Sequence, residues 1–290
     1  MAAVDRLRAD SIFWLLFFSL TLLNGFAIAL SPLGLSPDES HYWEWSRRLD
    51  WSYYSKGPLV AYMIAASTSL LGDTAFAVRL PTMLTYATFT AVFYFFIRRF
   101  YLPSYALLGW LALRSMLMFA QTGVLMTTDS AAALFWLLGL MSAYLAIVEE
   151  RRNFWLLFGF VIGLGIGAKY TLGILYASIF LYLILTPQVR SHIKSWQFWA
   201  GTLLLLLAVS PIIIWNMNHG WVNFSHNAGH LMKSGSLSLS FIFLPELLLG
   251  QAGLVGPIIF AGLVYALYRG VDNWRRGTSR RAFFSSPPCL

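Results

Sequence analysis

The stretch SPDESHYWEWSRRLDWSYYSKGPLVAYMIAASTSLLGDTAFAVRLP, from Ser36 to Pro81, decides the fold, because it separates a first apolar run from a long series of further apolar runs. It gathers acids, cations and aromatic residues in one place. Ser36 is a good N-cap, Pro37 suits the first helical position, and Glu39 stands where a capping box needs an acid. The pattern predicts a helix start here, with Asp38 in its first turn.

The two acids of this helix start allow a structural and a functional interpretation. Carboxylates in a first turn favour the helix dipole, so Asp38 and Glu39 could both be structural. The capping box needs Glu39 but does not need Asp38, which would stand at the membrane surface. Asp38 is therefore the better candidate for a catalytic role.

Composition places the chain among membrane proteins. It has 58% hydrophobic and 11% charged residues, and its mean hydropathy is +0.66, which predicts a polytopic membrane protein. The net charge of +8 could suit a nucleic acid, but the basic residues form short clusters between apolar runs, as topology signals do. We therefore expect no nucleic-acid partner, because no basic face is left to bind one. A lone cysteine, Cys289, excludes an internal disulfide.

The apolar runs predict the number of membrane crossings. The first run follows Arg6 and Arg8 and is too long for the apolar part of a signal peptide, so we expect it to be retained. Eight runs are long enough to cross a bilayer, and they lie at about 12–31, 78–97, 103–122, 130–148, 153–168, 171–186, 198–215 and 247–268. Pro58 to Leu71 is a shorter run that we expect to be interfacial or re-entrant.

The basic clusters fix the expected orientation. With eight crossings, the N-terminal arginines, Arg98-Arg99, Arg151-Arg152, the Arg190 region and the tail all fall on one side, which the positive-inside rule makes cytoplasmic. A ninth crossing at 58–71 would move Arg98 and everything after it to the opposite side. We predict an all-α polytopic bundle in one domain, 1–290. Its expected parts are a first external loop at about 32–77, a late external loop at about 216–246 and a basic cytoplasmic tail at about 269–290.

Two acids fall on the outer face in this topology. Asp38 follows the first run and Asp129 precedes the fourth. A carboxylate at the mouth of a membrane bundle is unfavourable unless it is solvated, paired or used, so both are functional candidates. The alternative for Asp129 is an N-cap of the fourth span, beside Thr127 and Thr128.

Several cations and aromatic residues accompany these acids. Lys56 follows Tyr53 and Tyr54 and precedes a Gly-Pro pair, which suits a lipid phosphate or sugar phosphate. Its alternative is a lysine that snorkels to water beside an ordinary aromatic belt. Arg114 lies within an apolar run and is expected to face a cavity or an acid, whereas Lys169 lies near the outer end of the fifth span and could simply snorkel. With Lys56, Tyr53 and Tyr54, both are candidate substrate-binding residues, because a cation there would offset the charge of a lipid phosphate or sugar phosphate.

The late loop contains three histidines. His226 and His230 are spaced to share a helix face for a metal, but nearby glycines and the lack of a close carboxylate favour hydrogen-bonding roles for both, as for His219. No Ser/His/Asp triad, Walker loop or glycine-rich dinucleotide turn is present in the sequence. We therefore predict no metal ligands, although a divalent ion shared by Asp38 and Asp129 stays open.

Five motifs occur in an order that is typical of one family: PDESHYWEWSRRLDWSYYSKGPLVAY, GDTAFAVRLP, GVLMTTDS, GAKYT and SPIIIWNMNHGWVNF. From the first span to about residue 230, the chain resembles the dolichyl-phosphate-mannose protein mannosyltransferase-like membrane glycosyltransferases, the group that includes bacterial lipid A aminoarabinose transferases. The resemblance implies a GT-C helix bundle with juxtamembrane helices over the active site. It also implies a polyprenyl-phosphate-linked sugar donor and an inverting transfer to a lipid, glycan or protein acceptor on the outer face.

The resemblance also implies roles for individual residues. Asp38 matches the catalytic acid with Glu39 as its partner, Asp129 matches the second external acid, and Lys56 matches the cation of the first loop. That cation often has an acid and two prolines around it, whereas Ser55 and Gly57 flank it here. This departure is expected to change the grip on the donor phosphate.

The resemblance leaves rival interpretations open. Family members usually continue through further spans and often a soluble domain, while this chain stops at RRAFFSSPPCL, so a fragment is expected. The alternatives are a transporter or lipid flippase, or an inactive truncated scaffold. The expected location is the inner membrane, among its lipids, with both termini cytoplasmic, and the alternative location is an endoplasmic reticulum membrane.

Overall fold

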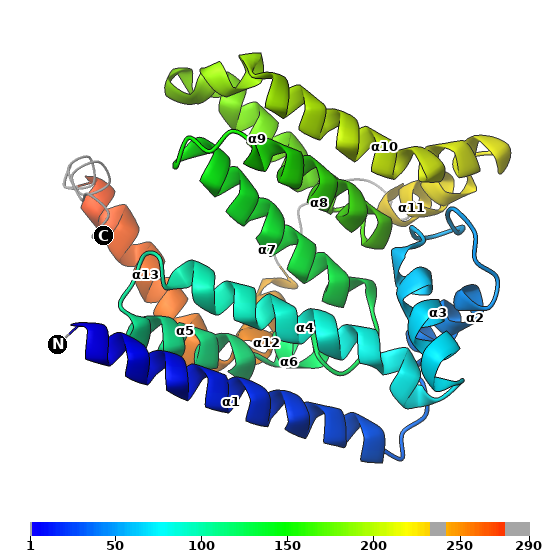
Figure 1. Ribbon diagram of the computed structural model, residues 1–290, viewed down its shortest axis with the longest axis horizontal. Coiled ribbons are helices and arrows are strands. Elements are labelled where there is room, and N and C mark those ends of the chain that lie inside the picture. Colours follow the sequence, from blue (N-terminus) through cyan, green and yellow to red (C-terminus); the bar gives the residue numbers. More distant parts are fainter. Residues whose placement is uncertain (1, 233–241, 276–290) are drawn as a thin grey trace. The chain divides into compact units, whose positions relative to one another are not determined.

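The computed structural model describes residues 2–232 and 242–275, and in these ranges every regular element is a helix (Figure 1). The predicted all-α class is therefore confirmed. The SGSLSLS segment and most of the basic tail lie outside the described residues. The elements are α1 (Ala2–Leu30), α2 (Pro37–Ser46), α3 (Leu59–Leu71), α4 (Ala75–Ile97), α5 (Pro103–Ser115), α6 (Leu117–Thr122), α7 (Thr128–Ile147), α8 (Phe154–Ala168), α9 (Leu172–Leu185), η1 (Pro187–Lys194), α10 (Trp196–Asn218), α11 (Val222–Met232), α12 (Leu244–Val255) and α13 (Pro257–Arg275).

Helix length separates candidate membrane crossings from shorter apolar helices. Among the described residues, four helices are long and apolar enough to cross a membrane: α1, α4, α7 and α10. Two further pairs bend at a break, α9 with η1 by 115° and α12 with α13 by 112°, and each pair could form one span. α3 and α8 are apolar but shorter. The chain is thus a multi-pass helical membrane protein whose described part holds four to six such spans, and eight crossings stay a prediction.

The run from about 103 to 122 is not the single helix that its composition predicts. α5 ends at Ser115, Met116 is extended (φ −70°, ψ 124°), and α6 begins at Leu117. The Ser115 hydroxyl donates to the Ala112 carbonyl at 2.8 Å, which gives the last turn a local hydrogen bond. This segment therefore differs from the prediction by one break in the helix.

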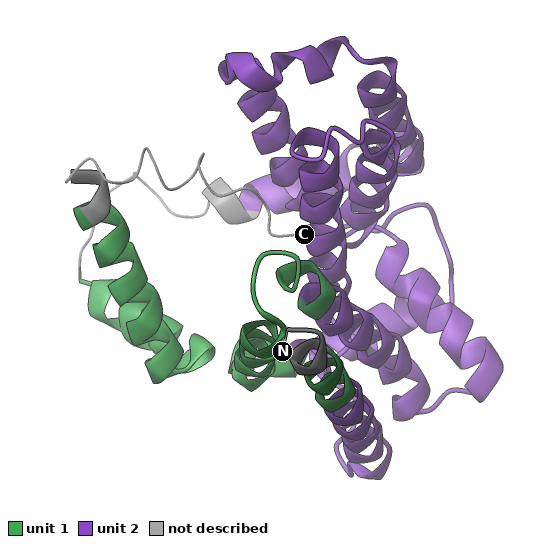
Figure 2. Cartoon of the chain, turned by 60° about the vertical axis from the view of Figure 1, so that its left-hand side comes forward, with its two compact units in different colours: residues 1–13, 94–121, 238–290 green, residues 14–93, 122–237 purple. Residues whose placement is uncertain are grey.

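The described chain divides into two compact units, coloured separately in Figure 2. Unit 1 contains residues 1–13, 94–121 and 238–290, and unit 2 contains residues 14–93 and 122–237. Within unit 1, Phe13 stacks on Tyr94 with ring centroids 3.9 Å apart. The Tyr94 hydroxyl donates to Asp10, which also pairs with Arg98. An acid and a cation are thus brought together between α1 and the end of α4.

Glycine packing forms the core of unit 2. α8 packs on α7 and α10, and a Cβ added at Gly159 would lie 1.8 Å from the Gly201 carbonyl oxygen of α10. At Gly201 an added Cβ would lie 2.1 Å from the Trp155 carbonyl oxygen. Close backbone approach of this kind is the way in which small residues pack helices in membranes.

The loop that follows α1 begins as its sequence predicts. Ser36 caps α2, with its Oγ accepting from the Glu39 N–H at 3.3 Å and its own N–H donating to Glu39 Oε2 at 2.9 Å. Pro37 is the first helical residue. Farther on, an added Cβ at Gly57 would lie 2.3 Å from the Gly167 carbonyl oxygen, so the turn before α3 packs directly on the end of α8. The capping box is therefore confirmed.

Candidate active site

Asp38 lies in the first turn of α2 and is exposed. The free N–H groups of a first turn carry partial positive charge, which stabilises a carboxylate there. Among the described residues, no hydrogen bond or ion pair engages the Asp38 carboxylate. The group is therefore available to a molecule that approaches this end of α2.

Glu39, its neighbour, is in a contrasting environment. Its side chain is fully buried, and its Oε1 accepts from Arg79 Nε at 2.8 Å and from the Met126 N–H at 3.0 Å. Its Oε2 accepts from Arg79 Nη2 at 2.9 Å as well as from Ser36. Both oxygens are thus engaged, which favours a positioning role for Glu39 over direct catalysis. The catalytic role predicted for it stays a prediction.

The electrostatics of Glu39 follow from these contacts. Burial alone would raise the pKa of the Glu39 carboxyl, but hydrogen bonds from Arg79, Ser36 and Met126 outweigh it and hold the pKa below its ordinary value. Glu39 therefore stays ionised at neutral pH. The Glu39 carboxylate of α2 is therefore linked to α4 through Arg79 and to the segment before α7 through Met126.

Asp129 lies in the first turn of α7, while Thr127 occupies the N-cap position without a side-chain capping bond. Asp129 is therefore not the N-cap that the structural interpretation required. Its carboxylate accepts a hydrogen bond from the Lys169 ammonium, and the two form an ion pair. Both side chains keep some exposure, with 57% of Asp129 accessible, so the pair stands in an open site.

Tyr42 connects the two candidate acids. It is buried on α2, one turn after Asp38, and hydrogen-bonds the Thr128 side chain. Burial, and then the charges on Asp38 and Asp129, raise the pKa of the Tyr42 hydroxyl to about 12. Two carboxylates from different helices thus act on one neutral phenol, which means that the starts of α2 and α7 converge.

The residues of the Lys56 segment divide between the interior and the surface of the loop. Tyr53 is buried, its ring stacks on Trp45 with centroids 4.4 Å apart, and its hydroxyl donates to the Trp45 carbonyl at 3.0 Å. Tyr54 is 43% exposed and meets His226 edge-on, at 5.2 Å between centroids. Burial of Tyr53 favours a role in holding the loop, whereas Tyr54 and the half-buried Lys56 are open to a ligand.

Arg114 belongs to α5 in unit 1, whereas the other predicted site residues belong to unit 2. Its guanidinium lies over the Trp110 ring, 5.3 Å from the centroid. Its predicted contact with substrate stays a prediction.

The structure bears on whether the histidines of the late loop could bind a metal ion. Within residues 2–232 and 242–275, no group of three or more His, Cys, Asp or Glu side chains could hold a metal ion. His219 stacks on Trp215 at 4.0 Å, and its Nδ1 lies 2.7 Å from the Trp215 carbonyl oxygen. The side chain of His230 lies outside the described residues. A divalent ion shared by the two acids stays a prediction.

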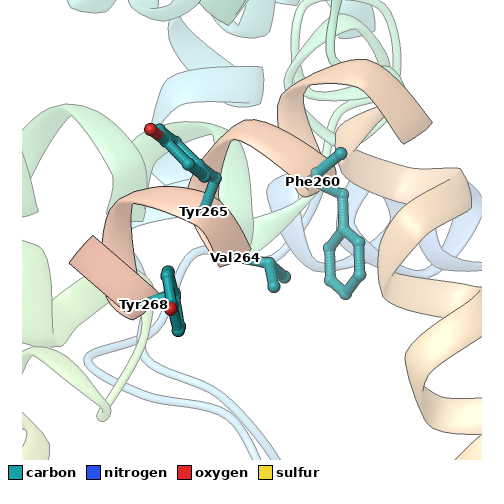
Figure 3. A pocket seen from close by; sticks show the side chains of 5 residues that line it. Phe260, Val264, Tyr265 and Tyr268 are labelled. Atoms are coloured by element: carbon teal, nitrogen blue, oxygen red, sulfur yellow. The ribbon is translucent and has the colours of Figure 1, made fainter. Parts of the chain in front are cut away.

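An apolar hollow of about 550 Å³ lies along α13 in unit 1 (Figure 3). It is lined by Phe260, Ala261, Val264, Tyr265 and Tyr268. With no carboxylate or cation among these residues, it offers no groups for acid, base or phosphate chemistry.

Sequence reasoning missed two residues of the site. Arg79 stands at the start of an apolar run, where an arginine needs an acid, but its partner Glu39 is forty positions away. Tyr42 follows Asp38 by four positions, so helical spacing already placed both on one face of α2. The first signal was a charge in an apolar run, and the second was helical periodicity.

The fold and the site define a class, a multi-pass helical membrane protein that carries converging acids at the ends of its helices. The family model for dolichyl-phosphate-mannose-protein mannosyltransferase matches residues 55–215, more than half of the chain. The chain therefore belongs to this family, as its motifs predicted.

Two relatives add detail. The lipid A galacturonosyltransferase RgtD of Rhizobium johnstonii is 28% identical over 241 residues, which cover 80% of this chain and 49% of RgtD. The crystal structure of ArnT from Cupriavidus metallidurans in the apo state is similar with a TM-score of 0.58 and 20% identity, over 90% of this chain and 51% of that one. The ArnT match supports the GT-C fold. The chain spans about half the length of the relatives that it matches.

Proposed function

We propose that the chain is part of an integral membrane glycosyltransferase that moves a sugar from a polyprenyl-phosphate donor to a lipid acceptor, with Asp38 as the general base. The observation that supports this most is the pair of carboxylates at Tyr42. Asp38 has no hydrogen bond or ion pair among the described residues, while Asp129 is paired with Lys169. One acid is thus free to accept a proton, and the other holds a cation.

The proposed reaction is a single displacement. The acceptor hydroxyl oxygen bonds to the anomeric carbon, while the bond from that carbon to the phosphate oxygen breaks. Asp38 takes the hydroxyl proton, and the lipid phosphate leaves with the bonding electron pair. Because the attack and the departure lie on opposite sides of the carbon, the anomeric configuration inverts.

Cations near the acids support departure of the phosphate. Lys56 lies in the same loop as Asp38 and, among the described residues, no carboxylate pairs with it. Lys169 is held by Asp129 at the start of α7. We assign to these two ammonium groups the stabilisation of the negative charge that develops on the donor phosphate.

The relatives and the predicted topology support the proposed acceptor and location. RgtD is named for transfer to lipid A, so a lipid acceptor, with lipid A as the first to test, has the best support. The basic clusters favour an inner-membrane protein with cytoplasmic termini and an external active site. Both assignments belong to the proposal.

The test measures transfer of radiolabelled sugar to lipid A in membranes that contain the chain. Polyprenyl-phosphate donors that carry galacturonic acid, aminoarabinose or mannose are compared. The variant is Asp38→Asn, and the matched control is Glu44→Gln, an exposed acid farther along α2. We expect the loss of the base to lower the rate by about 10²- to 10⁴-fold and the control to keep the wild-type rate.

Each other outcome has a defined meaning. Equal rates for the wild type and Asp38→Asn would remove Asp38 from the mechanism. No transfer by the wild type with any donor, either as this chain alone or when it is extended to the length of its relatives, would contradict the enzyme proposal and favour a non-catalytic scaffold. Retention of the donor's anomeric configuration in the product, measured by proton NMR, would contradict the single displacement.

A further inference from the structure

Two amide side chains of α11 hold the turn that carries Lys56, and α11 lies beside the first loop (Figure 1). Asn223 Nδ2 donates to the Tyr53 carbonyl at 2.6 Å and lies 3.4 Å from the Lys56 carbonyl oxygen. Asn227 Nδ2 donates to the Ser55 carbonyl at 3.2 Å. The backbone on both sides of Lys56 is therefore fixed by residues that lie some 170 positions later in the chain.

Asn223 also contacts the segment that carries the second cation. Its Nδ2 lies 2.6 Å from the Tyr170 hydroxyl, and Tyr170 directly follows Lys169. Tyr170 in turn hydrogen-bonds the Ser52 side chain, back in the first loop. One buried amide thus joins the Lys56 turn to the Lys169 segment.

The chemistry of these contacts requires a hydrogen-bond donor, which the Asn223 amide supplies. The backbone carbonyls around Lys56 only accept hydrogen bonds, so their partner must donate, and an amide nitrogen has two protons to give. Asn223 is fully buried, and its Oδ1 accepts from Asn227 Nδ2 at 3.2 Å. Each polar atom of this side chain is thus used, and an apolar replacement would remove the donor from the Tyr53 carbonyl, whereas the Lys56 carbonyl would keep the Tyr53 N–H and the Ser52 hydroxyl.

We propose that Asn223 is a positioning residue for the donor phosphate, because its amide holds the Lys56 turn to the side chain of Tyr170, the residue next to Lys169. The inference rests on the proposed function, in which both ammonium groups face that phosphate. A lysine side chain is flexible, so a small displacement of one turn weakens a single contact little. When two lysines must both contact one phosphate, a displacement of one turn is tolerated less well, because both contacts depend on the distance between the two ammonium groups.

The test measures binding rather than catalysis. The purified full chain is titrated with undecaprenyl phosphate and, in parallel, with uncharged undecaprenol, and both dissociation constants are determined. The variants are Asn223→Leu, which removes the donor without adding charge, Lys56→Gln, and the double variant. Asn216→Leu is the matched control, because Asn216 is equally buried but donates only within its own helix, to Ile212.

We expect Asn223→Leu to weaken binding of undecaprenyl phosphate about tenfold and to leave undecaprenol unchanged, while Asn216→Leu binds both like the wild type. The double variant should bind within about twofold of Lys56→Gln alone, because two residues that act through one contact are not additive. Tyr170→Phe removes one of the Asn223 contacts and should weaken phosphate binding by a few-fold. If Asn223→Leu fails to fold, Tyr170→Phe replaces it as the test variant.

Other results overturn the inference in distinguishable ways. Wild-type affinity in folded Asn223→Leu, or in Tyr170→Phe where Asn223→Leu does not fold, removes the positioning role and leaves the proposed function intact. Losses that multiply in the double variant would mean that Asn223 acts independently of Lys56. A wild-type chain that binds undecaprenol as tightly as undecaprenyl phosphate contradicts the donor site itself.

Discussion

At the residue scale, the two adjacent acids of α2 differ in burial and partners. Asp38 is exposed, whereas Glu39 is fully buried against Arg79, which is 4% exposed. Removing one member of a buried ion pair leaves an uncompensated charge, which costs about 3 to 5 kcal/mol, whereas an exposed pair contributes at most about 1 kcal/mol.

The first prediction uses this difference. We expect Glu39→Gln to destabilise the fold by about 3 to 5 kcal/mol, because Arg79 loses its buried counter-charge. Asp73→Asn is the control, since it breaks the exposed pair with Arg47 in the same loop and should change stability by less than about 1 kcal/mol. Thermal unfolding in detergent compares the two. Equal effects would mean that burial does not distinguish these pairs.

The second prediction concerns pH. The pKa of Glu39 is lowered in the folded chain from an ordinary value of 4.5, so folding favours its ionised form. The stability that this contributes is fully present above the unfolded pKa and is lost as the pH falls through the folded pKa. The difference in unfolding temperature between the wild type and Glu39→Gln should therefore narrow below about pH 4.5. A difference that widens in acid would contradict the assignment.

Single residues show what the sequence could and could not predict. The cap at Ser36 could be named from local helix chemistry, and the candidate acids Asp38 and Asp129 from their places just after the first apolar run and just before the fourth. The pairs Glu39–Arg79 and Asp129–Lys169 could not, because each joins positions forty apart. Such pairs depend on how the helices pack, which periodicity alone does not determine.

At the element scale, the packing of α8 on α10 requires glycines at the contact, because a Cβ there would overlap the other helix's backbone. We expect Gly159→Ala to destabilise unit 2 by about 1 to 3 kcal/mol, because its Cβ would overlap the Gly201 backbone. Gly173→Ala in α9 is the control, since an added Cβ there meets nothing within 4 Å and should stabilise the helix by up to about 1 kcal/mol. If close packing did not matter, both substitutions would shift the unfolding temperature in the same direction.

Elements also show the limits of apolar runs as predictors. The runs at 12–31 and 198–215 became the long helices α1 and α10, whereas 103–122 broke at Met116. Apolar composition indicates burial in lipid or protein, but it carries no signal for the extended backbone of Met116 that ends α5. The presence of helices was therefore predictable, and their continuity was not.

At the scale of the whole molecule, the predicted orientation has a direct test. Eight crossings put the first loop and η1 on opposite sides of the membrane, whereas a crossing by α3 would put them on the same side. Ser40 in α2 and Ser191 in η1 are both exposed, so each can be replaced by cysteine after Cys289→Ser removes the native thiol. We expect a membrane-impermeant maleimide to label Ser40→Cys in intact spheroplasts, and Ser191→Cys only after permeabilisation. Labelling of both without permeabilisation would mean that α3 spans the membrane, because one additional crossing reverses every later loop. Labelling of Ser191→Cys alone would reverse the orientation and place Asp38 on the cytoplasmic side, where the proposed external transfer could not occur.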